Sequence, residues 1–336
     1  MQTARQLGER AIIEIIWKHL SKAPNMRVSL GDDVSAIEGE GGAIAVLKTD
    51  MLVGRTDIPL QMSLWQAARK AVVMNVSDFA AKGVKPLGLV VSLGIPPDLT
   101  RKDIEQIAEG LNAGAREYGA FVLGGDTSET DDLIISVALY GSAGQKKLML
   151  RSGAHPGDIL ATTGPFGLSA SGLKILTEEI TTPPGIKGKL VGAVLLPQAR
   201  LIEGLALAKT GVVTASIDSS DGLAWSLYEI GRASDVGFLI DNPPIAPEAS
   251  RFAGTHLLDP VELTFYGGEE YELVVAVRPG GWRRAQEAVK MKGGRLIRIG
   301  RTTEKKGILL KQKGVIVQME ARGYEHFKQG GKRKIG

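Results

Sequence analysis

The sequence predicts an α/β protein of two domains, and three observations lead to this prediction. Strand-like apolar runs alternate with helix-like segments along the chain, as they do in α/β proteins. The chain has 336 residues, 43% hydrophobic and 23% charged, so it is too long for one ordinary core and too apolar for disorder. A polar, glycine-containing stretch at residues 141–156 interrupts the alternation. We therefore expect one domain at residues 1–148 and a second at residues 149–336.

The elements of the first half follow in order from periodicity and capping signals. Helical spacing of apolar residues, or a capping residue followed by helix formers, predicts helices at residues 7–20, 63–81 and 100–118. Short apolar runs bounded by turn residues predict strands at residues 43–48, 87–95, 121–123 and 133–140. Polar loops with glycine or aspartate separate these elements.

The second half continues the alternation without a solenoid repeat. Strands are predicted at residues 158–163, 212–217, 271–277 and 296–299. The first two of these strands run into glycine-rich loops at residues 164–167 and 218–222, and a helix is expected after each loop.

Composition excludes several classes of protein. The net charge is only +4 and the basic residues are dispersed, which argues against nucleic acid as the main ligand. No run approaches the ~18 apolar residues that cross a bilayer, and the N-terminus does not resemble a signal peptide, so we expect a cytoplasmic protein without a membrane partner. The chain has no cysteine and four histidines, so any metal is expected to bind oxygen ligands.

Aspartates are the main candidates for such ligands. All but Asp78 lie at or beside predicted turns, where a single aspartate is more often a turn former or helix cap than a ligand. The set is Asp32, Asp33, Asp50, Asp78, Asp126, Asp218 and Asp221. Asp78 lies with Asn75 in a strongly apolar helical segment and needs a partner, for which a cation and a remote lysine are both open. Mg²⁺ uses few protein carboxylates per ion, so this many aspartates would hold several ions.

Three further segments allow two interpretations each. The small residues between the strand and helix at 163–172 suit either phosphate binding by free backbone N–H groups or close helix packing. Glu269 precedes a strand and either projects toward a substrate or is solvated, and Tyr324 either stacks on a ligand ring or anchors the C-terminus. A Walker A sequence and the protein-kinase motifs are absent.

Taken in order, eight motifs make the chain resemble the thiamine-monophosphate kinase family, within the superfamily of aminoimidazole ribonucleotide synthetase. The motifs are Gly31-Asp32-Asp33, Thr49-Asp50, Asn75-Val76-Ser77-Asp78, Gly124-Gly125-Asp126-Thr127, Arg151-Ser152-Gly153, Asp218-Ser219-Ser220-Asp221-Gly222, Gly268-Glu269-Glu270-Tyr271-Glu272 and Gly323-Tyr324. The resemblance implies a two-domain fold of mixed sheets flanked by helices, with N-terminal sheets that pair in a homodimer. The chain departs from the family pattern at Lys48, where many members have serine, in the loop at residues 55–58, and at Glu270, where aspartate is usual.

The resemblance also implies the roles of individual residues. The implied Mg²⁺ ligands are Asp33, Thr49, Asp50, Asp78, Asp126, Asp218 and Asp221. The implied contacts to ATP are Gly125, Asp126, Arg151 and Ser220, with Asp78, Asp126 and Arg151 in catalytic positions. Asp57, Glu269 and Tyr324 correspond to positions on the side of the thiamine phosphate.

The reaction that the resemblance implies is direct, in-line transfer of the γ-phosphate of ATP to thiamine monophosphate. The nucleophile is already an anion and needs charge neutralisation rather than a strong base, which agrees with the lack of a cysteine or histidine nucleophile. Two alternatives stay open: a sibling enzyme of the superfamily that activates another substrate with ATP, and a non-catalytic regulator that binds Mg²⁺ and nucleotide.

Overall fold

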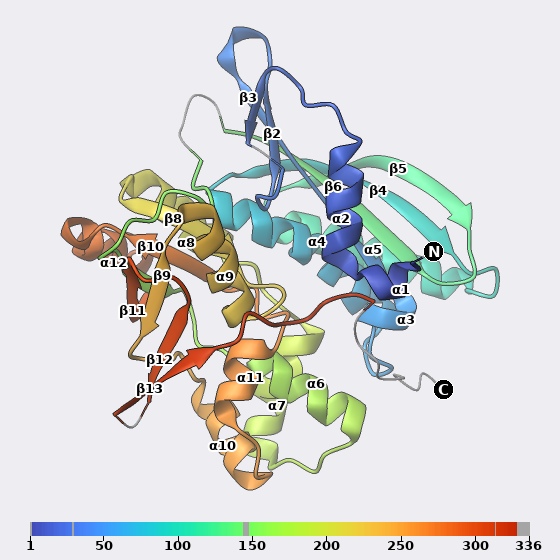
Figure 1. Cartoon of the computed structure of the whole chain (residues 1–336). Coiled ribbons are helices and arrows are strands. Elements are labelled where there is room, and N and C mark those ends of the chain that lie inside the picture. The colour runs from blue at the N-terminus through green and yellow to red at the C-terminus, as the bar shows by residue number, and fades with distance from the viewer. Residues whose placement is uncertain (1, 29, 144–147, 313, 328–336) are drawn as a thin grey trace.

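The computed structural model describes residues 2–28, 30–143, 148–312 and 314–327, which form two sheets flanked by helices (Figure 1). In these residues the first sheet has six strands in the order β1-β2-β3-β6-β4-β5, and the second has seven in the order β13-β12-β9-β11-β7-β10-β8. Each sheet contains parallel and antiparallel pairs. The predicted α/β class, with mixed sheets flanked by helices, is therefore confirmed.

The first sheet is covered by helices on one face. Its strands are β1 (Met26–Val28), β2 (Ser35–Glu38), β3 (Ile44–Val53), β4 (Pro86–Ile95), β5 (Phe121–Glu129) and β6 (Ile134–Ser142). Helix α4 (Leu64–Lys82) packs on β3 and β6, and α5 (Arg101–Glu117) packs on α4 and β5. In Figure 1 both helices lie below strands β4, β5 and β6. The connection through α5 is what makes β4 and β5 parallel.

Helices α4 and α5 begin where the sequence predicts, because local capping determines both starts. Ser63 and Thr100 each accept a hydrogen bond from the backbone N–H three residues on, and each forms a capping box. Gly83 ends α4 in the left-handed conformation, with φ at 67°. The other helices of the first half are the short α1 (Ala4–Leu7), α2 (Glu9–Lys18) and α3 (Gly54–Asp57).

The other face of the first sheet carries exposed apolar side chains. We call this the open face and define it by Leu47, Met51, Val90, Leu123 and Tyr140, which are 41–68% exposed. The five residues come from four neighbouring strands, β3, β6, β4 and β5. Lone exposed apolar residues are common on soluble proteins, but a contiguous set marks a surface suited to an interface.

Two polar motifs lie inside strands, where the sequence predicts the end of a strand or a turn. Asp50 is in the middle of β3 and pairs with Val137 of β6. Asp126 is within β5 and pairs with Ser92 of β4. The prediction that both lie beside turns is wrong, because cross-strand backbone pairing continues past the polar side chains on each strand.

The second half surrounds the second sheet. Its strands are β7 (Ile159–Thr162), β8 (Val213–Asp218), β9 (Gly237–Ile240), β10 (Leu273–Val277), β11 (Ile297–Thr303), β12 (Ile308–Gln312) and β13 (Val315–Met319). Its helices are α6 (Leu168–Glu178), α7 (Pro184–Leu195), α8 (Leu201–Thr210), α9 (Leu223–Ser234), α10 (Pro247–Thr255), α11 (Pro260–Tyr266) and α12 (Trp282–Lys290).

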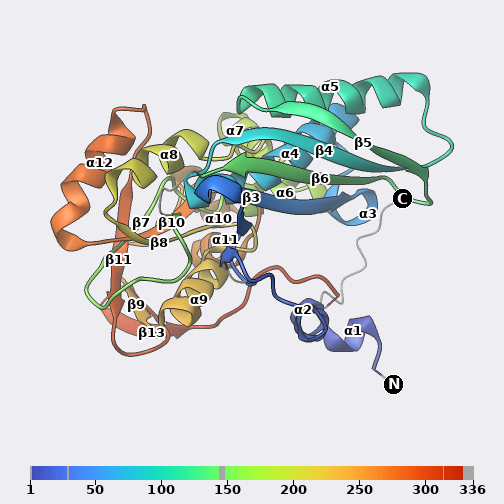
Figure 2. The same cartoon turned by 90° about the horizontal axis from the view of Figure 1, so that it is seen from above.

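Helix α4 connects the two halves. It contacts α8 and β8 as well as the first sheet, and Figure 2 shows α4 beside strands β4 and β6 and α8 beside strands β7 and β8. One cluster of buried apolar side chains contains residues of both halves, among them Val73, Leu207 and Val275. The domain boundary near residue 148 stays a prediction, and residues 328–336 of the predicted second domain lie outside the described part. Among the described helices, none combines the length and the apolar character that crossing a membrane requires.

Candidate functional site

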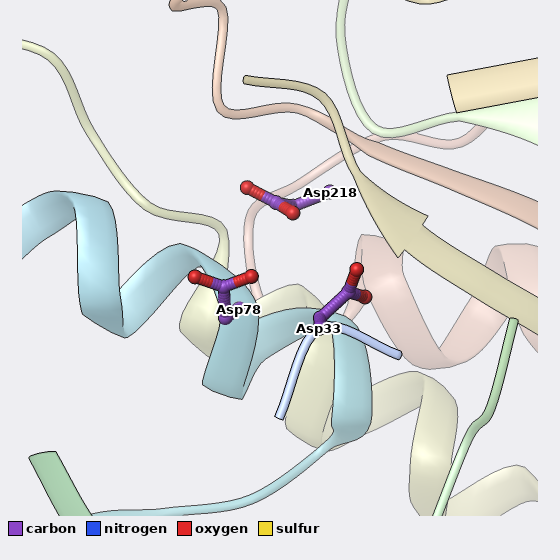
Figure 3. Close-up of side chains that lie close together, drawn as sticks. All are labelled: Asp33, Asp78 and Asp218. Atoms are coloured by element: carbon purple, nitrogen blue, oxygen red, sulfur yellow. The ribbon is translucent and has the colours of Figure 1, made fainter. Parts of the chain in front are cut away.

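Three buried carboxylates meet where the two halves join. Asp33 precedes β2, Asp78 lies on α4, and Asp218 ends β8, and Figure 3 shows their side chains close together. One oxygen of each carboxylate lies within 4.8 Å of an oxygen of the other two. Loops, helix and strand from both halves thus bring together three of the residues that the sequence singles out.

Asn75 holds α4 against strand β3 beside this cluster. Its side-chain oxygen accepts a hydrogen bond from the backbone N–H of Asp50 at 3.0 Å, and its amide nitrogen donates to the carbonyl of Ala71 at 3.0 Å. Asn75 and Asp78 are one helical turn apart. The two polar residues that the sequence identifies in this apolar helix therefore differ in role. Asn75 attaches the helix to β3, and Asp78 supplies a carboxylate to the cluster.

Lys48 lies between two of the aspartates. Its Nζ is 3.1 Å from Asp50 Oδ1 and 3.0 Å from Asp78 Oδ2. Burial lowers the pKa of Lys48, but the charges of Asp50 and Asp78 outweigh burial and hold the pKa above its usual range. Burial also raises the pKa of Asp78 well above its ordinary value, and Lys48 offsets this only in part. The remote lysine expected as a partner of Asp78 is present, and the carboxylate still favours more positive charge nearby.

Asp33 has two cationic partners. Arg151 Nε donates to Asp33 Oδ1 at 2.6 Å, and Lys82 Nζ lies 2.7 Å from Asp33 Oδ2. Burial raises the pKa of Asp33, but these two cations outweigh burial and hold the pKa below its usual range. Within the described residues, the buried ammonium of Lys82 is therefore the partner of Asp33 Oδ2, and Arg151 is the partner of Asp33 Oδ1. Arg151 also donates to the carbonyl of Gly31 at 3.0 Å, which fixes its guanidinium.

The carboxylates of the second half are pushed toward their neutral forms. Burial, followed by the charge of Asp33, raises the pKa of Asp218 to about 6, although Ser77 donates a hydrogen bond to it. Burial, followed by the charges of Glu9 and Asp218, raises the pKa of Asp221 to about 7. Crowded, buried carboxylates are the ligands that Mg²⁺ prefers, so the residues present fit this ion.

The predicted substrate side lies around Lys70, which is fully buried. Its Nζ is 2.5 Å from Glu269 Oε1 and donates to the carbonyl of Asp57 at 3.1 Å. The Asp57 side chain turns back to accept the N–H of Val53 at 2.8 Å. Glu269 has a left-handed backbone, with φ at 63°, and stays 33% exposed at its side chain. Lys70 thus brings two predicted substrate residues together, and nothing in its sequence context identifies it.

Tyr271 is a candidate that sequence reasoning misses. Its side chain is buried and its φ is 53°, a strained value for a residue other than glycine. Burial, then the charges of Glu269 and Asp50, raises its pKa well above the ordinary value. The charges that act on this phenol belong both to the substrate side and to the carboxylate cluster. Its position inside a run of glutamates is the only sequence signal that points to it.

The neighbouring glutamates serve the fold. Glu270 accepts hydrogen bonds from the backbone N–H groups of Gly167 (2.6 Å) and Ser169 (3.1 Å), so its carboxylate caps helix α6. Glu272 binds Arg200 and Thr163. Because Glu270 takes these N–H groups, they are not free for phosphate. A Cβ on Gly172 would lie 2.0 Å from a backbone oxygen of α7, so close packing explains the small residues at 163–172.

Thr49 and Asp126 lie apart from the cluster within one chain. Thr49 points to the open face, because side chains alternate along β3 and Asp50 faces α4. Asp126 is in register with exposed Ser92, whereas Gly125 is in register with buried Val91, so Asp126 also belongs to the open face. Strands β3 and β5 are three positions apart, which separates them by about 14 Å.

The remaining predicted contacts lie beside Asp221. The backbone N–H of Tyr324 donates to the carbonyl of Asp221 at 3.0 Å, and the carbonyl of Ser220 accepts from the N–H of Glu269 at 2.6 Å. The ring of Tyr324 packs edge-on against His326. These backbone bonds bring the C-terminal segment and the Glu269 loop together at residues 220–221.

Comparisons with known proteins agree with this arrangement. Residues 31–143 match the family model "AIR synthase related protein, N-terminal domain", and residues 155–311 match the corresponding C-terminal domain. The thiamine-monophosphate kinase of Nitrosopumilus maritimus is 35% identical over 96% of this chain and 99% of its own length. That of Bacillus subtilis is 31% identical over 96% of this chain and 100% of its own length.

Solved structures are similar over nearly the whole chain. AaThiL in complex with AMPPCP and TMP has a TM-score of 0.84 and 27% identity, and covers 97% of this chain and 99% of its own. The protein tt0281 of Thermus thermophilus has a TM-score of 0.83 and 32% identity over 91% of this chain and 97% of its own. HypE of E. coli, at 20% identity and a TM-score of 0.69 over 94% of this chain and 98% of its own, shares the fold.

Proposed function

The chain belongs to the thiamine-monophosphate kinase family, and we propose that it transfers the γ-phosphate of ATP to thiamine monophosphate, which yields thiamine diphosphate and ADP. The observation that carries this proposal is the meeting of Asp33, Asp78 and Asp218 at the junction of the two halves, beside Arg151. Relatives named thiamine-monophosphate kinase match over nearly their full length. The similar AaThiL structure contains AMPPCP, an analogue of ATP, together with TMP.

The carboxylate cluster supports Mg²⁺ as the metal. We propose Asp33, Asp78 and Asp218 as ligands, with Asp50 and Asp221 beside them. The raised pKa values of Asp78, Asp218 and Asp221, and the approach of Asp33, Asp78 and Asp218 to within 4.8 Å of one another, support this assignment. When bound, Mg²⁺ supplies positive charge that neutralises and orients phosphate oxygens.

The chemistry then requires little of the protein beyond positioning. A phosphate oxygen of thiamine monophosphate forms a bond to the γ-phosphorus as the bond to the β,γ-bridging oxygen breaks, and ADP leaves with that electron pair. Arg151, fixed by Asp33 and Gly31, is placed to neutralise phosphate charge. Glu269 and Asp57, both bound to Lys70, are proposed to face the substrate, with Tyr324 beside them; Gly125 and Ser220 are proposed to contact ATP.

We also propose that the enzyme is a homodimer whose subunits pack through the open face. If the two-fold axis runs parallel to the strands, β5 of one subunit lies over β3 of its partner, because the strand order β3-β6-β4-β5 reverses across the axis. Asp126 shares a register row with Met51, two residues from Thr49 on the same face. Such a dimer would bring Asp126 close to Thr49 of the partner subunit, which supports a metal role for both residues and an ATP role for Asp126.

One assay tests the proposed function. The purified chain is supplied with ATP, Mg²⁺ and thiamine monophosphate, and thiamine diphosphate and ADP are measured by chromatography. Equal amounts of both products, and none without the acceptor, are expected. ADP release only with a different phosphate acceptor would instead indicate a sibling enzyme. ATP binding without turnover on any acceptor would indicate a nucleotide-binding regulator.

A further inference from the structure

Lys48 projects an ammonium group into the carboxylate cluster from strand β3. Lys48 and Asp50 are two residues apart on β3, so their side chains share the face that packs against α4. The Nζ atom bridges Asp50 Oδ1 and Asp78 Oδ2 at 3.1 and 3.0 Å. The side chain is 20% exposed, so it is not fully enclosed by the protein.

The bridge places a positive charge where two proposed metal ligands meet. A lysine ammonium is a compact point charge that is positive at neutral pH. The distances from Lys48 Nζ to the oxygens of Asp50 and Asp78 are those of an ammonium–carboxylate contact, whereas Mg²⁺ binds oxygen at about 2.0–2.1 Å. An ion bridging the same two oxygens would require the ammonium to leave, because both cannot occupy one position.

Lys82 shows what a purely structural lysine looks like in the same region. Its Nζ lies 2.6 Å from Asp32 Oδ1 and 2.7 Å from Asp33 Oδ2 and donates to the carbonyl of Ser216 at 2.8 Å. Its side chain has no exposed surface. Lys48 has no comparable backbone anchor among the contacts of the described residues, and it is held only by the two aspartates.

We propose that the Lys48 ammonium permanently occupies one cation position of the aspartate cluster, so that this enzyme binds one divalent ion fewer than it would with a neutral oxygen donor at residue 48. The inference rests on the proposed Mg²⁺ cluster. Lys48 acts here as a positioning residue: it holds Asp50 and Asp78 together before any ion binds. The cluster then needs less divalent ion to reach its working arrangement.

The test counts ions directly and does not depend on turnover. Bound Mn²⁺ is titrated by electron paramagnetic resonance in the full-length wild type, in Lys48→Ser and in Lys48→Met. Lys48→Ser is expected to bind one more Mn²⁺ per chain than the wild type. Lys48→Met removes the positive charge between the two aspartates and supplies no oxygen donor in its place. This variant is expected to have a lower metal-free Tm and a larger rise in Tm with Mn²⁺. Lys189→Ser, which removes an exposed lysine paired with Glu248, is the control.

The outcomes separate this inference from the proposed function. Equal Mn²⁺ counts in the wild type and in Lys48→Ser would overturn the role of Lys48, even if the wild type is an active kinase. A wild type that binds no Mn²⁺ would overturn both the metal cluster and the role of Lys48, whereas the product assay judges the kinase activity independently. If Lys48→Ser does not fold, Lys48→Gln supplies a longer oxygen donor, and the same count decides.

Discussion

Ser77 Oγ donates a hydrogen bond of 2.8 Å to Asp218 Oδ2, which joins helix α4 of the first half to the end of strand β8 in the second. Both residues are buried. Because Asp78 follows Ser77 directly, one turn of α4 both contributes a carboxylate to the cluster and orients another. The relative position of Asp78 and Asp218 therefore depends on the packing of α4 against β8.

Asp78→Asn should separate catalysis from stability. The change keeps the size of the side chain and removes a charge that burial and the neighbouring aspartates already disfavour. We expect the maximal rate of thiamine diphosphate formation to fall by at least ~100-fold, because an amide is a weak ligand for Mg²⁺. The metal-free Tm should stay the same or rise, since repulsion from Asp218 and Asp50 is relieved. Near-normal turnover would remove Asp78 from the proposed metal site.

Gly204→Ala should loosen the joint between the two halves. An added Cβ at Gly204 on α8 would lie 2.0 Å from the backbone oxygen of Ala80 on α4, so one helix has to move. We expect a loss of ~1–3 kcal/mol in the free energy of unfolding. We also expect the carboxylate cluster to be displaced from its arrangement, so that the enzyme needs more Mg²⁺ to reach its maximal rate. Denaturant unfolding measures the first effect, and Mg²⁺ dependence of the rate measures the second.

Gly192→Ala is the matched control for this change. Gly192 lies in helix α7, and a Cβ there would meet no atom within 4 Å. Helix propensity alone should then stabilise the protein by ~0.5–1 kcal/mol. If both variants lose the same stability, tight packing at Gly204 is not the cause.

Local signals explain which parts of the fold the sequence predicts well. The predicted helices at 63–81 and 100–118 agree with α4 and α5 to within one residue at each end, because Ser63 and Thr100 cap them within a single turn. Short strands such as β1, β9 and β13 escape prediction, since three to five residues carry too little alternation. Their existence depends on pairing with distant strands.

In the candidate site, too, local signals are recognisable in the sequence and long-range contacts are not. Asp78 and Asn75 are recognisable because polar side chains in an apolar helix need partners. The partner of Asp78 is Lys48, which lies thirty residues earlier on another element, and no local pattern connects the two. The capping of α6 by Glu270 spans a still longer separation, and for that reason the small residues at 163–172 leave two interpretations open from sequence alone.

Glu270→Gln should change how stability depends on pH. Burial raises the pKa of Glu270 to about 7, above the value expected in the unfolded chain. The folded state therefore holds the proton more tightly, and the stability that this group contributes is present below about pH 4.5 and is lost as the pH rises to 7. Gln is neutral throughout and still accepts both N–H bonds. We expect the variant to gain ~2–3 kcal/mol relative to the wild type between pH 5 and pH 8.

Chemical denaturation at the two pH values measures this gain, with Glu178→Gln as the control because Glu178 is exposed. The control should show no comparable change. A gain that is equal at both pH values would mean that packing, and not ionisation, distinguishes the variant.

Two open-face substitutions should separate the subunits of the proposed dimer. Leu123 and Met51 are 68% and 55% exposed, and paired Leu123→Glu and Met51→Glu changes place charge in the interface. We expect light scattering to give twice the chain mass for the wild type and the single mass for the variant, with loss of kinase activity. Met291→Glu, at a residue 79% exposed beyond α12, is the control and should leave both unchanged. A monomeric wild type at micromolar concentration would overturn the dimer.

Mixed dimers can then decide in which subunit Asp126 acts. Asp78→Asn and Asp126→Asn are each expected to be inactive alone, because each removes a proposed ligand from every site. If Asp126 serves the site of the partner subunit, a mixed dimer contains one site with both residues intact, and random mixing restores about a quarter of the wild-type rate. If Asp126 serves its own subunit, every site in the mixed dimer lacks one ligand and no activity returns. Recovery would therefore support the placement of Asp126 beside Thr49 of the partner subunit, whereas its absence, with dimers confirmed by light scattering, would contradict that placement.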